Sequence, residues 1–356
     1  MKPSISSPVK FSFSVILASA VLLTGCGKAT PSAATDSSTV SASPSSAVTA
    51  SASPAPAEGK KLKVVASFYP MYEFARQVGG DYAEVTALIG GGVEPHDWEP
   101  TPKDVAAIQE ADLFVYNGIV EGWADKVITS AASDKRVDVK ASEGITLAEG
   151  EDEHDHDHEG EAGHEEDNHD STGEGSHEEE EHGLDPHVWL SPVLAQKEVQ
   201  TIAEAYKKAD PAHKDEYQKN ADAYIAKLKE LDEAFKTDLQ NVLRKDFITQ
   251  HAAFAYLAKE YGLTQVPIAG LSPEQEPSPE QMAEVITFAQ DHQVKTIFFE
   301  TLVEPKIAET IAKEIGAKTD VLNPLEGLTD EERQKGLDYI GIMKNNLEAL
   351  KKALSE

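Results

Sequence analysis

The chain of 356 residues has a single cysteine, Cys26, and therefore cannot form an intramolecular disulfide. Its apolar run at residues 11–23 is shorter than the roughly 20 residues that a membrane-spanning helix needs. Cationic side chains are also scarce: the chain has 32 Lys and Arg but 63 Asp and Glu, which gives a net charge of −31. This shortage argues against a nucleic-acid partner, whose phosphates require stripes of Lys and Arg. An acidic surface is instead compatible with attracting cations.

The N-terminus has the features of a lipoprotein signal peptide, which we predict over residues 1–25. Lys2 and Lys10 precede an apolar run of signal-peptide length. The run ends in Leu23-Thr24-Gly25-Cys26, which resembles a bacterial lipobox, where the cysteine is lipidated and becomes the mature N-terminus. Because one acyl chain binds a membrane weakly, we expect a diacylglyceryl anchor at Cys26. The protein would then lie at the cell surface, on the outer face of the bacterial cytoplasmic membrane.

The rest of the chain divides by composition and periodicity. Residues 26–59 are mostly Ser, Ala, Thr and Pro, which predicts a disordered tether. Strand-like and helix-like segments then alternate, as in an α/β fold with mainly parallel sheets flanked by helices. We predict an N-terminal α/β lobe over residues 60–210 and a C-terminal α/β lobe over residues 245–356. Between them, residues 211–244 carry one apolar stripe, which indicates a long linking helix or, alternatively, an ordinary surface helix.

Residues 149–182 interrupt the N-terminal lobe with a His/Asp/Glu-rich loop. This loop contains seventeen Asp or Glu, no Lys or Arg and no core-forming residues, so we expect it to be disordered without metal. A purely solvating loop would explain the carboxylates but not the imidazoles. We therefore predict weak accessory metal binding by seven histidines: His154, His156, His158, His164, His169, His177 and His182.

Three further histidines lie where predicted strands end or helices begin. His96 follows a strand and three glycines, His187 lies in the turn "LDPHVWLSP", and His251 ends the strand "DFITQ". Ligands of open α/β sheets bind beyond the carboxyl ends of the strands, and a helix N-terminus keeps an imidazole neutral and free to bind metal. Glu300 ends the strand "TIFFE", and its carboxylate could face the same cleft, although such a residue more often caps a helix.

Taken together and in this order, six segments resemble the zinc-binding solute-receptor family of bacterial ABC importers (ZnuA/AdcA-like, cluster A-I). The segments are "ASFYPMYEFARQVGGD", "GVEPHDWEPTPKDV", "ADLFVYNG", "DPHVWLSP", "GLSPEQEPSPEQM" and "IFFE". The resemblance covers about residues 61–354. It implies two α/β lobes joined by a long rigid helix, with one metal between the lobes. It also implies four metal ligands, two from each lobe: His96, His187, His251 and Glu300.

The implied ligands favour zinc, although the family also contains manganese receptors. Three imidazoles and one carboxylate suit a tetrahedral zinc site, whereas manganese prefers more oxygen ligands. The residue that distinguishes the two metals best is His251, because an imidazole at this position favours zinc over manganese. Three nearby carboxylates, Asp97, Asp185 and Glu121, are candidates for orienting the histidine rings, or are simply surface residues.

These features predict a monomeric, lipid-anchored receptor that captures Zn²⁺ and delivers it to the membrane permease of an ABC importer for uptake, and not an enzyme. The alternatives are a manganese receptor, a zinc-dependent hydrolase and an adhesin lipoprotein. A catalytic zinc usually has three protein ligands and a water, and the sequence contains no His-Glu-x-x-His motif. An adhesin would need no convergent ligands.

Overall fold

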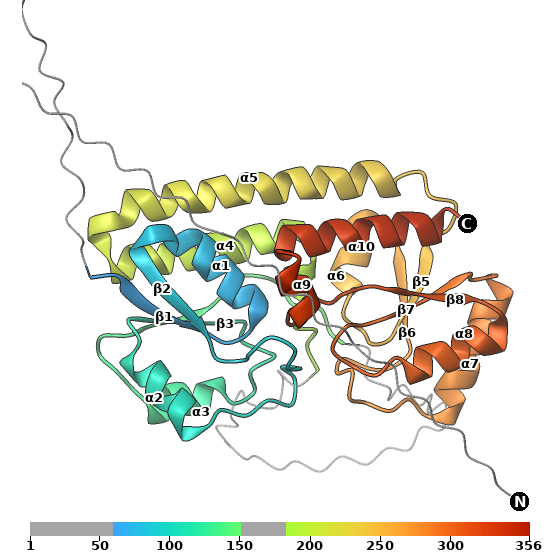
Figure 1. Cartoon of the computed structure of the whole chain (residues 1–356), viewed down its shortest axis with the longest axis horizontal. Coiled ribbons are helices and arrows are strands. Elements are labelled where there is room, and N and C mark those ends of the chain that lie inside the picture. The colour runs from blue at the N-terminus through green and yellow to red at the C-terminus, as the bar shows by residue number, and fades with distance from the viewer. Residues whose placement is uncertain (1–59, 151–182) are drawn as a thin grey trace, which may run out of the picture. The chain divides into compact units, whose positions relative to one another are not determined.

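The computed structural model describes residues 60–150 and 183–356, which belong to one compact unit, Pro56–Glu356. Cys26, the predicted signal peptide and tether, and the seven loop histidines lie outside the described residues. In the described part, two four-stranded sheets with flanking helices lie side by side, and one long helix runs past both (Figure 1). The predicted α/β fold with two lobes is confirmed. None of the helices described is long and apolar enough to cross a membrane.

The N-terminal sheet is entirely parallel and has the strand order β2-β1-β3-β4. Its central strand β3 is buried along its whole length, because helices cover both faces of a parallel sheet. The strands are β1 (Leu62–Ala66), β2 (Ala83–Ala87), β3 (Leu113–Tyr116) and β4 (Val137–Lys140). The helices are α1 (Tyr69–Gly79), α2 (Pro102–Glu110), α3 (Ala124–Ser130) and α4 (Pro192–Ala209).

The C-terminal sheet repeats this topology with the order β6-β5-β7-β8, again parallel. The strands are β5 (Asp246–Thr249), β6 (Thr264–Pro267), β7 (Thr296–Phe299) and β8 (Lys318–Val321). The helices are α6 (Ala255–Tyr261), α7 (Pro279–Asp291), α8 (Lys306–Ile315), α9 (Asp330–Gln334) and α10 (Tyr339–Leu354). Parallel strands bring all the loops that follow them to one edge of each sheet, and these loops supply the site.

Two helices begin at capping sequences that are recognisable in the amino-acid sequence. Thr101 caps α2: its side chain accepts the backbone N–H of Asp104, whose carboxylate accepts the N–H of Thr101 in return. Ser278 and Gln281 form the same reciprocal pair at α7. A proline at the first helical position of each follows the usual pattern, since its missing N–H would have no partner there.

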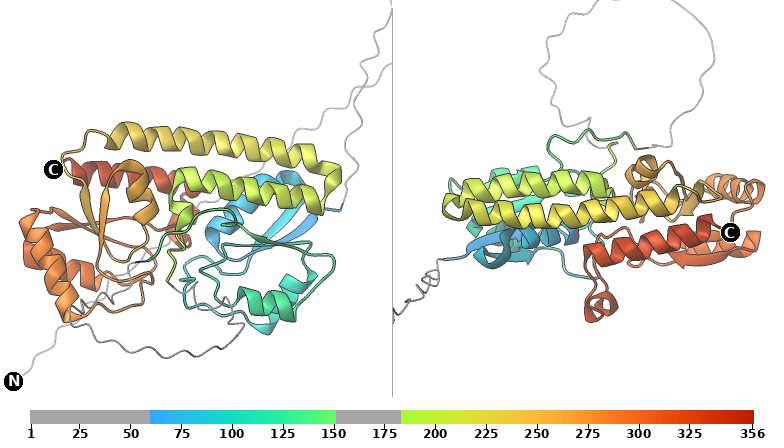
Figure 2. Two further views of the ribbon diagram at one scale, coloured as in Figure 1. Left: turned by 180° about the vertical axis from the view of Figure 1, so that it is seen from behind. Right: turned by 90° about the horizontal axis from the view of Figure 1, so that it is seen from above.

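Helix α5 (Lys214–Leu239) has 26 residues and runs past both sheets, with α4 and α10 packed along it (Figures 1 and 2). It is somewhat shorter than the predicted helix, since Val242 lies beyond its end. The helix buries one stripe at spacings of three or four residues, as an amphipathic helix must. The buried stripe consists of Tyr217, Ala221, Tyr224, Leu228, Leu231, Phe235 and Leu239.

The C-terminal segment does not remain within its own lobe. The ring of Tyr339 in α10 packs against Phe74 of α1 at 5.0 Å between centroids, and its hydroxyl donates to the carbonyl of Trp189. The indole N–H of Trp189 in turn donates to the Pro324 carbonyl at 2.8 Å. One hydrophobic cluster contains residues of both lobes, including Phe74 and Phe247. The two lobes are therefore joined by a continuous core as well as by α5.

The N-terminal lobe also buries a carboxyl group that has no hydrogen-bond partner. Glu198 of α4 is fully buried, and neither of its oxygens is hydrogen-bonded within the described part of the chain. Burial, with a smaller contribution from Glu121, raises the pKa of Glu198 from 4.5 to about 8. A carboxyl group with a higher pKa in the folded state takes up a proton on folding. Its contribution to stability is therefore greatest below pH 4.5 and is lost as the pH rises toward 8.

We expect Glu198→Gln to remove this pH dependence, because glutamine has the same shape without the ionisation. At pH 5 the free energy of unfolding should stay within about 1 kcal/mol of the wild type, and at pH 8 it should exceed the wild type by roughly 2–4 kcal/mol. Denaturant unfolding at both pH values measures this difference. Exposed Glu204→Gln in the same helix is the control and should follow the wild type. An unchanged pH dependence in Glu198→Gln would contradict the assignment.

Candidate metal centre

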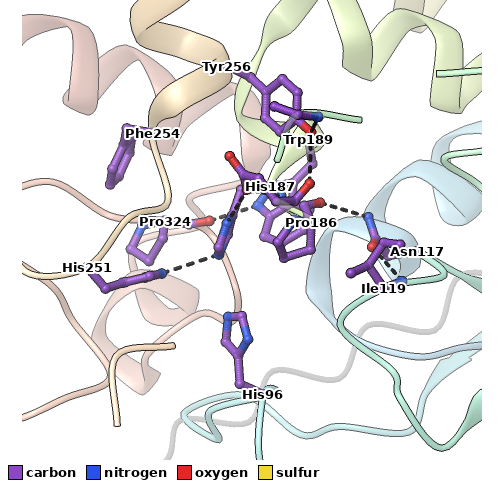
Figure 3. A network of polar contacts seen from close by, with 12 residues as sticks. His96, Asn117, Ile119, Pro186, His187, Trp189, His251, Phe254, Tyr256 and Pro324 are labelled. Atoms are coloured by element: carbon purple, nitrogen blue, oxygen red, sulfur yellow. Dashed lines mark hydrogen bonds and ion pairs between the residues drawn. The ribbon is translucent and has the colours of Figure 1, made fainter. Parts of the chain in front are cut away.

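His96 lies in the loop after β2, which contains Gly90, Gly91 and Gly92. Its backbone N–H donates to Oε2 of Glu94 at 2.9 Å, which fixes the loop just before the imidazole. The ring reaches the cleft between the lobes and remains partly exposed. In Figure 3 it points toward the rings of His187 and His251 from the opposite side.

His187 directly precedes the short 3₁₀ helix Val188–Leu190 and is completely buried. The carboxylate of Asp185 accepts both its backbone N–H at 3.0 Å and its ring Nδ1–H at 2.7 Å. On the other side, the side-chain amide of Asn117, after β3, donates to the Pro186 carbonyl at 3.2 Å (Figure 3). These contacts fix the ring so that Nε2 faces the cleft.

His251 follows β5 and is likewise completely buried. Oε1 of Glu300 accepts its ring Nδ1–H at 2.6 Å and its backbone N–H at 3.1 Å. Its carbonyl accepts hydrogen bonds from the Thr249 hydroxyl at 2.8 Å and from the Gln265 amide at 2.8 Å. Like His187, His251 is held from behind by a carboxylate and presents Nε2 to the cleft.

Glu326 completes the group from the loop between β8 and α9. Its Oε1 lies 3.1 Å from His96 Nε2, 3.4 Å from His187 Nε2 and 3.5 Å from His251 Nε2. The ligand atoms of these four residues all lie within 4.8 Å of one another. Three side chains from loops of both lobes thus meet a fourth at one buried point.

The structure differs from the sequence prediction at the fourth position, where it places Glu326 and not Glu300. Glu300 immediately follows β7, next to β5, and at that distance its carboxylate meets the back of the His251 ring. Glu326 stands five residues beyond the end of β8, so its loop is long enough to reach the cleft. Sequence reasoning selected the carboxylate nearest a strand end and missed the one in the longer loop.

The three carboxylates proposed to orient the rings have different roles in the structure. Asp185 contacts the His187 ring, as the sequence suggested. Glu121 instead accepts the backbone N–H groups of Asn117 and Gly118 at 3.0 and 2.9 Å and so supports the ring only through Asn117. Asp97 is exposed. Glu300, predicted as a ligand, contacts the His251 ring as Asp185 contacts the His187 ring.

The hydrogen bonds determine which ring nitrogens are free. Because Nδ1 of His187 donates to Asp185 and Nδ1 of His251 donates to Glu300, each neutral ring has its lone pair on Nε2. These two Nε2 atoms lie only 3.3 Å apart. Two lone pairs at that distance repel each other unless a cation lies between them. The arrangement therefore fits a metal ion or a proton and nothing neutral.

The distances match zinc. A tetrahedron with zinc–ligand bonds of about 2.0–2.1 Å has ligands about 3.3 Å apart. Four of the six separations among the ligand atoms are 3.1, 3.3, 3.4 and 3.5 Å, and the ligand atoms all lie within 4.8 Å of one another. Two of the three rings, those of His187 and His251, are also supported as zinc-bound histidines usually are, through a carboxylate on the other nitrogen.

The pKa shifts of the residues at the metal centre also show that the site favours positive charge. Burial disfavours the His251 cation, but the charges and hydrogen bonds of Glu300 and Glu326 together outweigh it and raise the pKa of His251 to about 10. Burial also opposes ionisation of Glu326, yet hydrogen bonds from His187, His251 and His96 hold its pKa well below the usual range. Burial, followed by repulsion from Glu326, raises the pKa of Glu94 to about 8. A bound divalent cation would replace the protons that these shifts favour.

Comparison with known proteins shows the family of this chain. A family model for the periplasmic component A of zinc-uptake complexes, ZnuA, matches residues 64–353. The chain belongs to this family. It is 55% identical over 301 residues to the high-affinity zinc uptake system protein ZnuA of Bacillus subtilis, covering 84% of this chain and 90% of that one. It is 45% identical over 298 residues to the zinc-binding lipoprotein AdcA of Streptococcus pneumoniae, and the match spans 83% of this chain and 56% of AdcA.

Solved structures of the family have the same fold. The Zn(II)-bound ZnuA-like domain of S. pneumoniae AdcA superposes with a TM-score of 0.68 at 41% identity, covering 83% of this chain and all of that one. The laminin-binding protein Lmb of Streptococcus agalactiae, described as having adhesin and metal-transporting activity, gives a TM-score of 0.69 at 38% identity, covering 82% of this chain and 99% of Lmb. The predicted resemblance to zinc-binding solute receptors is confirmed.

The two glutamates of the site should respond differently to removal of their charge. Glu326→Gln removes a candidate ligand, so we expect zinc affinity to fall by about 10³-fold, whereas Glu300→Gln should cost about 10–100-fold, the usual effect of losing a ligand's supporting contact. Competition against a fluorescent chelator measures both. The visible spectrum of the Co(II)-loaded protein provides the second readout.

The cobalt spectrum should match the wild type in Glu300→Gln, because all four candidate ligands remain, and should change in Glu326→Gln, because water or the amide replaces the carboxylate. The reverse pattern would assign Glu300 as the ligand.

Proposed function

We propose that this protein is an extracytoplasmic zinc receptor of an ABC importer, which captures Zn²⁺ between its two lobes through His96, His187, His251 and Glu326. The observation that supports this most strongly is the convergence of four donor atoms, from loops of both lobes, at tetrahedral spacing. Its membership of the zinc-uptake family agrees with this proposal.

The composition of the site favours zinc over the alternatives. Three imidazoles and a single carboxylate match the borderline-soft, four-coordinate preference of zinc, whereas manganese prefers more oxygen ligands. Four protein ligands would also complete the zinc shell and leave no position for a reactive water, so we propose binding and not hydrolysis. The metal-transporting and adhesin activities of Lmb belong to one protein, and for this chain we propose the metal function alone.

Delivery would occur at the membrane. We propose that Cys26 carries a diacylglyceryl anchor, which holds a monomeric receptor beside the importer's permease on the outer face of the bacterial cytoplasmic membrane. The lipobox-like sequence and the description of AdcA as a lipoprotein support the anchor.

The acidic loop would serve as an accessory to this site. Its described ends lie together: Glu149 pairs with Leu184, and the N–H of Gly150 donates to the Gly183 carbonyl at 2.6 Å. The segment after them leads within a few residues to Asp185 and His187, the buried end of the metal centre. We propose that the histidines of residues 151–182 bind zinc weakly and gather it near the receptor.

Competition calorimetry tests both the preference for zinc and the proposal that residues 151–182 bind metal separately from the four-residue site. With Zn²⁺, we expect one tight site, and with Mn²⁺ a site weaker by at least about 100-fold, because the donor set is rich in nitrogen. Removal of residues 151–182 should abolish weak additional binding and leave the tight site unchanged. Manganese binding tighter than zinc would contradict the metal assignment, and loss of the tight site on deletion would contradict the accessory role of the loop.

A further inference from the structure

Glu94 lies beside the metal centre, and one of its two carboxylate oxygens has no hydrogen-bond partner among the described residues. Its Oε2 accepts the backbone N–H of His96 at 2.9 Å, which pins the side chain. Its Oε1 is buried, accepts no hydrogen bond within the two described ranges, and lies 3.9 Å from His96 Nε2. A buried carboxylate oxygen without a partner costs stability, so its retention calls for a reason. Holding the His96 loop requires only Oε2.

The position of Glu94 coincides with the open side of the site. The side chains of His187 and His251 are 0% exposed and that of Glu326 is 1% exposed, whereas His96 is 11% exposed. Glu94, at 13%, is exposed to a similar degree. Among these five side chains, those of His96 and Glu94 are therefore the ones that an ion arriving from solvent meets first.

We propose that Glu94 is a transfer ligand, which binds zinc through Oε1 while the ion moves between solvent and the four-ligand site. This inference rests on the proposed zinc-binding function. As zinc arrives, one bound water leaves and Oε1 of Glu94 takes its position beside His96. The coordination shell of zinc expands readily to five, so Glu326 can bind before Glu94 departs. Oε1 then returns to its place 3.9 Å from His96 Nε2, with Oε2 still on the His96 N–H.

A ligand of this kind changes rates and not the equilibrium. Glu94 would stabilise zinc on its way between solvent and the four-ligand site, but not at either end of that path. It would therefore lower the barrier in both directions, and both zinc uptake and zinc release should be faster when Glu94 is present. This distinguishes Glu94 from Glu326, whose loss should weaken equilibrium binding. It also distinguishes Glu94 from a residue that only holds the loop, since glutamine keeps an oxygen for the His96 N–H.

Stopped-flow measurements on the full chain test the proposal, with Zn²⁺ as the probe and a fluorescent chelator in excess for release. In Glu94→Gln we expect the association and release rate constants each to fall by about tenfold, with the equilibrium Kd within about threefold of the wild type. Glu94→Asp, whose arm is one methylene shorter, should be slowed similarly. Glu99→Gln makes the same substitution at an exposed position of the same loop and should match the wild type.

Each other outcome has a definite meaning. Unchanged rate constants in Glu94→Gln would overturn the proposal, and so would a Kd raised more than tenfold at an unchanged association rate, which would make Glu94 an equilibrium ligand. Equal slowing in Glu99→Gln would attribute the effect to general electrostatic attraction and would also overturn it. Failure of the wild type to bind zinc tightly would refute the proposed function itself and is seen before any variant is compared.

Discussion

The metal centre depends on two buried imidazole nitrogens that are held so close together that a metal ion or a proton must lie between them. Asp185 and Glu300 bind the Nδ1–H groups of His187 and His251 and so turn two Nε2 lone pairs toward each other at 3.3 Å. Glu326 adds a buried carboxylate within 3.5 Å of both. A tetrahedral divalent ion satisfies all of them at once.

This arrangement requires a rigid scaffold, because each lobe supplies only part of the site. The continuous core along α5, the contact of Tyr339 with Phe74 and the hydrogen bond from Trp189 to Pro324 join the lobes directly behind the ligands. His187 itself lies two residues before Trp189, so this link between the lobes and a candidate ligand belong to one short segment. Only His96, on a glycine-rich loop, remains near solvent.

Much of this was predictable from sequence, because the signals were local. Strands such as β3 and the capping boxes of α2 and α7 are determined within a few residues, and three of the four grouped side chains follow predicted strands or turns. The short edge strand β4 has only four residues, alternately apolar and charged, and so gives a weaker signal. Glu326 was missed for a different reason: it lies in an irregular loop, and only the packing of β8 beside β7 brings that loop to the cleft. Its neighbour Leu325, at φ 61°, shows how far that backbone departs from a regular element.

Zinc K-edge X-ray absorption of the full chain with one equivalent of Zn²⁺ tests the central claim most directly, since it reports the ligands in solution. A site built from His96, His187, His251 and Glu326 predicts four nitrogen or oxygen ligands at about 2.0–2.1 Å, with the outer-shell scattering of three imidazoles. A six-coordinate shell, or one with fewer than two imidazoles, would contradict the account.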